Sequence, residues 1–218
     1  VLGLFGLVGA GRSETLRAAF GLDAIRSGTV HLGDLDISSN SPRQRWAEGV
    51  GFLSENRKED GLLLARSIAE NLFITRPGDL VRWGFWHPPS EHREAQAWMK
   101  PLDIRAHSPS QPVQELSGGN QQKVAFGRLM YHDSQVLLLD EPSMGLAPQM
   151  IANIFRIITE INKQGVTILL VEQNAQQALQ RADRAYILET GNVTKEAKAA
   201  DLLNDPAVRE AYLGTGAH

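Results

Sequence analysis

The sequence has no cysteine, no long apolar run and no excess of positive charge, and each absence narrows the range of functions. Without cysteine, a disulfide framework, a thiolate zinc site and a cysteine nucleophile are excluded. A membrane span needs about 18 or more apolar residues, whereas the clearest apolar run, Val166–Val171, has the length of a strand. The chain has 22 Lys and Arg against 25 Asp and Glu, so it lacks the basic footprint of a dedicated nucleic-acid binder.

The start of the sequence lacks two further features. Val1 stands where an initiator Met would be, and no basic residue precedes the hydrophobic stretch that follows. A secretory signal peptide begins with a basic segment. We therefore expect no signal peptide, and we interpret the N-terminus as cropped.

Short β-branched or leucine-rich runs alternate with helical patterns along much of the chain. This alternation predicts an α/β fold with a mostly parallel sheet and helices on both faces. The expected strands are Val1–Val8, Thr29–Leu32, Val50–Leu53, Val136–Asp140, Val166–Val171 and Ala185–Glu189. The clearest expected helices are Ser13–Phe20 and Pro148–Asn162, the second of which repeats its apolar residues at three- and four-residue spacing.

The middle of the chain has a different pattern, with helices but no strong strands. Helices are expected there at Ser67–Ile74 and Ser90–Lys100. We therefore expect one domain, residues 1–218, in which a helical subdomain of about 61–133 is inserted into an α/β core of about 1–60 and 134–218. After this core, two short amphipathic segments, Glu196–Leu203 and Pro206–Tyr212, are expected to close the chain.

A glycine-rich loop lies between the first predicted strand and the first predicted helix. Residues 6–13 read Gly-Leu-Val-Gly-Ala-Gly-Arg-Ser, which has the spacing of a phosphate-binding loop except that Arg12 replaces the usual Lys. Such glycines let backbone N–H groups surround phosphate oxygens, and the Ser13 hydroxyl can bind Mg²⁺. The loop alone is also compatible with a simple tight turn between strand and helix.

Two acidic residues end the predicted strand Val136–Asp140. Asp140 and Glu141 would emerge at the carboxyl edge of the sheet, where ligands of open α/β sheets bind. There Asp140 would hold Mg²⁺ through water, and Glu141 would orient or deprotonate an attacking water molecule. A solvated strand end is the alternative interpretation.

A third motif, Leu116–Lys123, reads Leu-Ser-Gly-Gly-Asn-Gln-Gln-Lys and opens a predicted helix. Ser117 and two glycines at a helix N-terminus form a second anion site; a plain helix cap is the alternative. In this order, the three motifs resemble the nucleotide-binding domain of an ABC transporter, a phosphate-loop NTPase fold.

The resemblance implies ATP and Mg²⁺ as ligands and assigns a role to each motif. Glu141 would be catalytic, and Ser13 and Asp140 would bind the metal. The signature, which acts on ATP held by a partner domain, would comprise Ser117, Gly118, Gly119, Asn120 and Gln121. The nucleotide would be bound by Gly6, Leu7, Val8, Gly9, Ala10, Gly11, Arg12, Ser13, Glu14 and Gln173.

The resemblance divides between two kinds of importer. Residues 1–142 resemble the second ATPase half of ribose/galactose-type sugar importers, which share the Ser54–Leu62 segment and the Leu116–Lys123 motif. Residues 140–214 are similar to the smaller ATPase subunit of branched-chain amino-acid importers. A recombined, designed or misassembled sequence is therefore one interpretation of the chain.

Several positions depart from the family pattern. Ser54 and Glu55 stand where the family has a Gln that contacts Mg²⁺, Gln173 replaces a His, and Ala147 replaces an Asp at the dimer interface. The resemblance also implies antiparallel strands before the phosphate loop, one with an aromatic residue that stacks on adenine; these precede Val1 in the family and are missing here.

Two functions remain open at this point. The first is the ATP-hydrolysing subunit of an importer on the cytoplasmic face of the membrane, with a sugar as the favoured cargo and a branched-chain amino acid as the second. Its partners would be a second nucleotide-binding domain, identical or different, transmembrane permease subunits and, indirectly, a solute-binding protein, with no nucleic acid. The alternative is a non-catalytic half that supports a partner's ATPase site, or a non-functional chimeric fragment.

Overall fold

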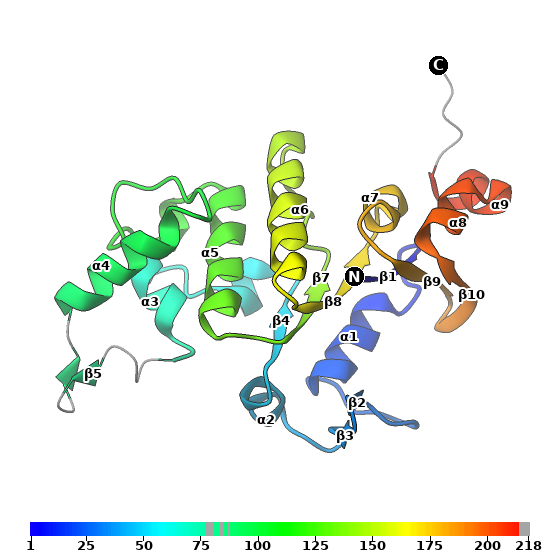
Figure 1. Cartoon of the computed structure of the whole chain (residues 1–218), viewed down its shortest axis with the longest axis horizontal. Helices are drawn as coiled ribbons and strands as arrows, with labels where there is room; N and C mark the ends of the chain where they lie inside the picture. Colours follow the sequence, from blue (N-terminus) through cyan, green and yellow to red (C-terminus); the bar gives the residue numbers. More distant parts are fainter. Residues whose placement is uncertain (77–80, 83–84, 87, 214–218) are drawn as a thin grey trace. The chain divides into compact units, whose positions relative to one another are not determined.

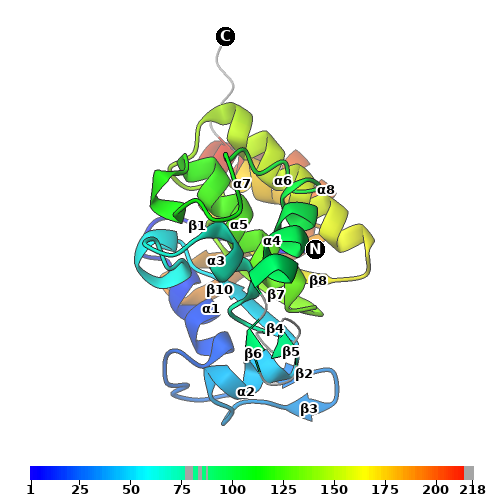
Figure 2. The same ribbon diagram turned by 90° about the vertical axis from the view of Figure 1, so that its left-hand side faces the viewer.

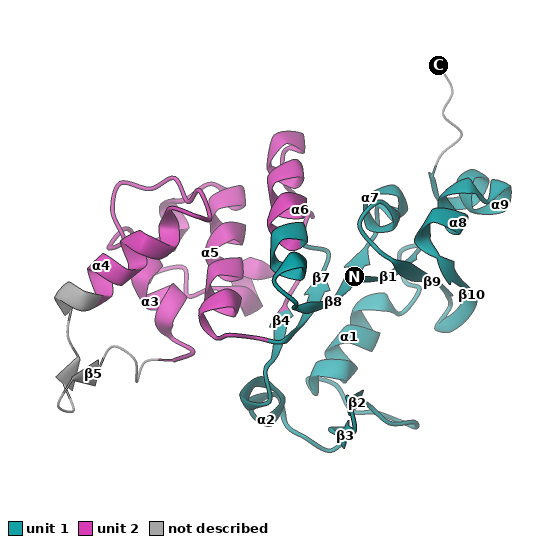
Figure 3. Ribbon diagram, viewed as in Figure 1, with its two compact units in different colours: residues 1–52, 135–142, 159–218 teal, residues 53–134, 143–158 magenta. Residues whose placement is uncertain are grey.

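A computed structural model of the chain (Figures 1 and 2) describes residues 1–76, 81–82, 85–86 and 88–213. The chain forms two compact units (Figure 3). The first contains residues 1–52, 135–142 and 159–218, and the second contains residues 53–134 and 143–158. Gly214, the last residue of the segment that resembles amino-acid importers, lies outside the described residues.

A six-stranded sheet forms the centre of the first unit, in the order β10-β9-β1-β8-β7-β4. The strands are β1 (Leu2–Gly6), β4 (Val50–Leu53), β7 (Val136–Asp140), β8 (Thr167–Glu172), β9 (Arg184–Glu189) and β10 (Asn192–Lys198). β9, β1, β8 and β7 are parallel neighbours, and β10 is antiparallel to β9. The mostly parallel sheet expected from the sequence is therefore confirmed.

Helices cover both faces of this sheet because neighbouring residues of a strand point to opposite faces. Leu4 of β1 packs in one buried cluster with Leu16 and Phe20 of α1 (Arg12–Phe20). The next residue, Phe5, packs in a second cluster with residues of α7 (Ala175–Leu179), α8 (Ala199–Asn204) and α9 (Pro206–Val208). The last turn of the described chain, η4 (Arg209–Leu213), places the Tyr212 ring edge-on to Phe5.

The sequence-based expectations need correction in two places. The strand expected at Thr29–Leu32 does not join the main sheet, because β2 (His31–Leu32) pairs with β3 (Leu35–Asp36) in a hairpin of its own. The segment expected at Glu196–Leu203 is divided, since its first residues belong to β10 and α8 begins at Ala199. A turn at Thr190 and Gly191, both with positive φ, folds β10 back onto β9 as an exposed edge strand.

A buried arginine closes the C-terminal end of α1. Arg45, on α2 (Pro42–Ala47), donates from Nη1 to the carbonyl oxygens of Ala18, at 2.8 Å, and Ala19. Its Nη2 donates to the carbonyl oxygen of Ser38 at 2.9 Å. A cation is favourable at this end of a helix, so Arg45 stabilises the helix that follows the phosphate loop.

The second unit is mainly helical. Helices α3 (Ile68–Phe73), α4 (Pro88–Met99) and α5 (Gly118–Tyr131) pack against one another (Figure 2). The ring of Tyr131 lies 4.6 Å from that of Phe73 and 5.8 Å from that of Trp98. The shorter elements are η1 (Arg57–Gly61), η3 (Val113–Glu115) and the hairpin of β5 (Val81–Arg82) and β6 (Phe85–Trp86).

Helix α6 (Pro148–Lys163) contributes its residues 148–158 to the second unit and its last turn to the first. Its apolar stripe is buried as the spacing predicts, at Ile154, Phe155, Ile158 and Ile161. Within the described ranges, none of the helices combines the length and the apolar composition that crossing a bilayer would require.

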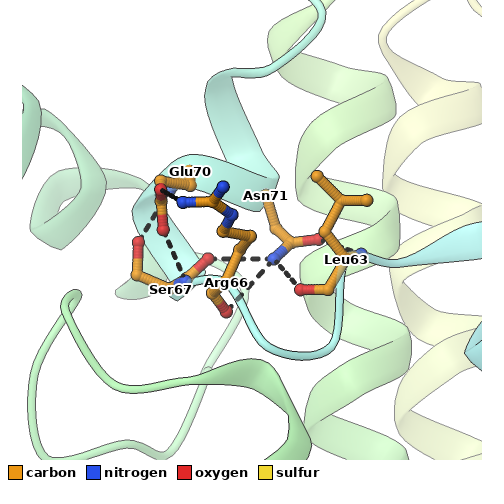
Figure 4. Close-up of polar contacts among 5 residues, drawn as sticks. All are labelled: Leu63, Arg66, Ser67, Glu70 and Asn71. Atoms are coloured by element: carbon orange, nitrogen blue, oxygen red, sulfur yellow. Dashed lines mark hydrogen bonds and ion pairs between the residues drawn. The ribbon is translucent and has the colours of Figure 1, made fainter.

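One buried amide holds the loop that leads into α3 (Figure 4). Asn71 Nδ2 donates to the carbonyl oxygens of Leu63 and Ser67, both at 2.9 Å, and Asn71 Oδ1 accepts from the Leu63 N–H at 2.8 Å. Ser67 and Glu70 form a capping box at the start of the helix, and the backbone hydrogen bond from Ser67 is the main reason that the pKa of Glu70 is lowered. Loop and helix therefore form one hydrogen-bonded element.

Candidate functional site

The glycine-rich loop lies between β1 and α1, as the sequence predicts. Gly9 and Gly11 have φ values of 78° and 91°, which side chains with a Cβ rarely adopt. Leu7 and Val8 are 63% and 77% exposed, so the loop stands clear of the core. The loop therefore presents its backbone at the surface, next to the N-terminus of a nine-residue helix, as an anion site requires.

The structure brings Ser13 and Asp140 together. Ser13 Oγ donates to Asp140 Oδ1 at 2.9 Å, although the two residues are far apart in sequence. Asp140 is buried at the end of β7, where the parallel register with β8 places it beside Val171. A hydroxyl and a carboxylate are the oxygen ligands that Mg²⁺ takes beside a nucleotide, so this pair fits the metal that the sequence analysis assigned to it.

Arg12 is paired with Glu141, a contact that the sequence analysis did not anticipate. Arg12 Nη2 lies 2.9 Å from Glu141 Oε1, with the two side chains 5% and 8% exposed. Arg12 Nη1 donates to the carbonyl oxygen of Glu172 at 3.0 Å. The guanidinium expected to hold phosphate is thus bound to the carboxylate expected to activate water. Glu141 also has a φ of 44°, an uncommon conformation that places its side chain just past the strand end.

Three buried acidic residues, Asp140, Glu141 and Glu172, lie at the carboxyl ends of β7 and β8. Glu141 pairs with Arg12, and Asp140 accepts from the Ser13 hydroxyl. Carboxylate oxygens are ligands that Mg²⁺ takes, so this end of the sheet suits a divalent cation brought in with a polyphosphate. Glu172 is the member that sequence reasoning missed; its only signal was an acid at the end of the apolar strand β8.

Two members of the expected nucleotide-binding set lie beside this group. Glu14 is exposed in the first turn of α1, and Gln173 is exposed immediately after β8. Asn174, the next residue, caps α7 by accepting the Gln177 N–H on its side-chain oxygen at 3.1 Å. The first unit therefore gathers the glycine-rich loop, Asp140, Glu141 and Gln173 at one end of its sheet.

The signature residues begin α5 in the second unit. Ser117 is the N-cap, and its Oγ accepts from the Asn120 backbone N–H and from Asn120 Nδ2, the latter at 3.2 Å. Asn120 and Gln121 are buried and bind their own unit, since Gln121 Nε2 donates to the carbonyl oxygen of Val113 at 3.2 Å. Gly119 is buried against Met150, which leaves no room for a Cβ. Ser117 and Gly118 are therefore the signature residues that reach the surface.

A pocket of about 340 Å³ lies beside Ser117, lined by residues 105–107, 111 and 115–117. At the same helix end, Nη2 of Arg57 would lie 2.8 Å from a Cβ placed on Gly118. In the sequence, Arg57 and the neighbouring Lys58 form a short basic run. No pattern in the sequence signals its proximity to Gly118.

The comparisons with known proteins agree with this geometry. A family model described as ABC transporter matches residues 1–144. The putative ribose/galactose/methyl galactoside import ATP-binding protein 1 of Rhizobium etli is 34% identical over 218 residues, 100% of this chain and 41% of that protein. The ribose import ATP-binding protein RbsA of Rhodococcus jostii is 36% identical over 196 residues, 90% of this chain and 39% of that protein.

The chain thus spans about two fifths of the length of these relatives. The Rhizobium protein aligns along the whole chain, including residues 140–214, for which the sequence analysis favoured an amino-acid importer subunit. Among solved structures, the ADP conformation of MJ1267, an ATP-binding cassette of an ABC transporter, matches with a TM-score of 0.79 and 25% identity, covering 99% of this chain and 88% of that one. The dimeric ATP-binding cassette MJ0796 bound to ADP and Pi has the same fold, with a TM-score of 0.75 and 21% identity over 91% of this chain and 84% of its own.

Proposed function

This chain belongs to the ABC transporter family as an ATP-binding domain, and we propose that it couples ATP binding and hydrolysis to the import of a sugar. The observation that carries the proposal is the contact of Ser13 with Asp140 at the phosphate loop. The cargo is inferred from the relatives, whose names specify ribose or galactose import. A branched-chain amino acid is the second candidate cargo, from the resemblance of residues 140–214.

In this proposal, each part of the first unit has a defined task. Backbone N–H groups of the loop from Gly6 to Gly11 bind the phosphates. Ser13 and Asp140 would hold Mg²⁺, which would supply positive charge beside the phosphates. Glu141 orients water for attack on the terminal phosphate and accepts its proton, which requires the carboxylate to separate from Arg12.

The proposed assembly contains more than this chain. A second nucleotide-binding domain, identical or different, offers its signature to ATP held here, and the chain offers Ser117 and Gly118 in return. The pair would drive transmembrane permease subunits at the cytoplasmic face of the membrane, supplied by a solute-binding protein. No nucleic acid takes part.

The experiment that tests nucleotide binding is calorimetric titration of the purified chain with Mg·ATP. We expect Ser13→Ala to weaken binding about 10- to 100-fold, since a hydrogen bond to a charged group is worth about 1.5–3 kcal/mol. In EDTA the difference between Ser13→Ala and the wild type should disappear, because the hydroxyl acts through the metal.

Thr15→Ala is the matched control for this titration. The Thr15 hydroxyl lies two residues away and donates to the carbonyl oxygen of Gly11 at 2.7 Å, within its own helix. Its removal should leave Mg·ATP binding unchanged. A folded wild-type chain that binds no Mg·ATP would overturn the proposed function.

A non-catalytic nucleotide-binding half is the second candidate function. It is favoured by the ion pair of Arg12 with Glu141, which occupies the proposed base, and by Gln173 and Ala147 at positions where the family has His and Asp. Glu141→Gln separates the two candidates in the assembled transporter. Loss of hydrolysis with retained ATP binding supports catalysis by this chain, whereas an unchanged hydrolysis rate supports the non-catalytic role.

A further inference from the structure

Arg57 lies against the end of α5 that carries the signature. Its Nη1 donates to the carbonyl oxygen of Met144 at 3.2 Å. A Cβ on Gly118 would lie 2.8 Å from Nη2 of Arg57 and 3.6 Å from Leu146. The guanidinium therefore connects the 143–147 loop with the first glycine of the signature, and all of these residues belong to the second unit.

The charge of Arg57 is poorly compensated at this position. Burial lowers the pKa of Arg57, and its Nε is buried without a hydrogen-bond partner. In the described part of the chain, no carboxylate forms an ion pair with it. The N-terminus of α5, a helix of 14 residues, is itself a positive end that disfavours a neighbouring cation. The guanidinium of Arg57 and the positive end of α5 thus lie close together beside Ser117. A bound anion would stabilise this arrangement.

We propose that Arg57 is a further phosphate-contacting residue, which this chain supplies with Ser117 and Gly118 to ATP held by a second copy of the chain. The inference rests on the proposed function, and it adds a residue that the signature motif does not include. A planar guanidinium offers paired N–H donors that match phosphate oxygens. The pocket of about 340 Å³ that Ser117 lines would provide room for an adjoining part of the nucleotide.

The second copy is the occupant that the charges favour. Arg12 of the phosphate loop is bound to Glu141, so the terminal phosphate in one copy must compete with a carboxylate for this positive charge. Arg57 of the facing copy would supply that charge from the opposite side. Each copy then contributes one arginine to the site of the other.

The test measures self-association of the full chain by analytical ultracentrifugation with Mg²⁺ and a non-hydrolysable imido analogue of ATP. We expect Arg57→Ala to weaken association about 10- to 100-fold, from the strength of a hydrogen bond to a charged group. Binding of the analogue by dilute monomer should stay unchanged, because the chain's own phosphate loop does not involve Arg57. Arg57→Lys should restore part of the association, because lysine keeps the positive charge but lacks the paired N–H donors of the guanidinium.

Lys58→Ala is the matched control, because Lys58 is the exposed neighbour in the same basic run. It should associate as the wild type does. Equal association of Arg57→Ala and the wild type would overturn the role of Arg57, as would a wild-type chain that binds the analogue yet remains monomeric. Failure of the wild type to bind any nucleotide would instead overturn the proposed function, and the role of Arg57 with it.

A mixing experiment distinguishes a contact to the facing copy from a structural role. Ser13→Asp blocks its own loop with a carboxylate but keeps Arg57, whereas Arg57→Ala keeps an intact loop. In the mixture, one site pairs the intact loop with the intact arginine, so we expect association that neither variant shows alone. A mixture that behaves as the separate variants do would overturn the proposal, even if both variants are folded.

Discussion

Arg12 and Arg57 belong to different compact units and are held in contrasting ways. In the first unit, Arg12 is buried, pairs with Glu141 and donates to the carbonyl oxygen of Glu172. In the second unit, Arg57 is half-buried, lies at a positive helix end and has no carboxylate partner among the described residues. Without a ligand, the Arg12 guanidinium is therefore paired with a carboxylate, whereas Arg57 keeps a buried Nε that has no hydrogen-bond partner.

The two arginines should therefore respond differently when a ligand binds. An arginine that is already paired must exchange a carboxylate for a phosphate, and the released carboxylate then becomes available to water. An arginine without a carboxylate partner gains a contact and loses none. Ligand binding should therefore rearrange the first unit and stabilise the second.

Of the substitutions that test this contrast, Arg12→Ala should lower the unfolding free energy most. Removing one member of a buried ion pair leaves an uncompensated charge and costs about 3–5 kcal/mol of unfolding free energy. Urea denaturation followed by circular dichroism measures this loss. Arg17→Ala, which removes a half-exposed pair with Asp23 on the same helix, is the control and should cost about 1 kcal/mol or less. Equal losses in the two variants would mean that burial of Arg12 adds no stability.

Asn71→Ala tests the stability of the second unit, and its expected effect on the unfolding free energy is intermediate. Its removal leaves the Leu63 N–H without its acceptor, whereas the carbonyl oxygens of Leu63 and Ser67 keep backbone donors. An unsatisfied buried group costs about 1–3 kcal/mol. Hydrogen exchange should show the loss as faster exchange in α3 and in residues 63–67. Asn56→Ala, which removes an exposed contact with Glu59, should change neither quantity. If hydrogen exchange became equally faster throughout the first unit, the two units would unfold together.

Arg57→Ala should change the unfolding free energy least. The variant loses one hydrogen bond to Met144 but also removes a partly buried cation from a positive helix end. We expect the unfolding free energy to stay within about 0.5 kcal/mol of the wild type, as for many substitutions outside the core. Thermal and urea denaturation without nucleotide measure it. A loss comparable to that of Arg12→Ala would indicate a structural role for Arg57.

Much of the first unit could be predicted from the sequence because its signals are local. The strand Val136–Asp140 appears with the predicted bounds, and the helix predicted at Ser13–Phe20 begins one residue earlier. The exposed strand β10 was missed because it alternates weakly and carries charges, as edge strands do. The hairpin of β2 and β3 was only half recognised, since its second strand has two residues and both are exposed.

The fold class and the three motifs follow from the amino-acid sequence, because the glycines and hydroxyl of the phosphate loop and the apolar runs of the strands are patterns of neighbouring residues. The contact of Arg12 with Glu141, 129 positions away, and the position of Arg57 beside Gly118 arise only when the chain folds. Sheet register sets the first contact and helix packing sets the second. Neither contact produces a periodic pattern in the sequence. Each joins single residues from distant segments, which come together only when the backbone has folded.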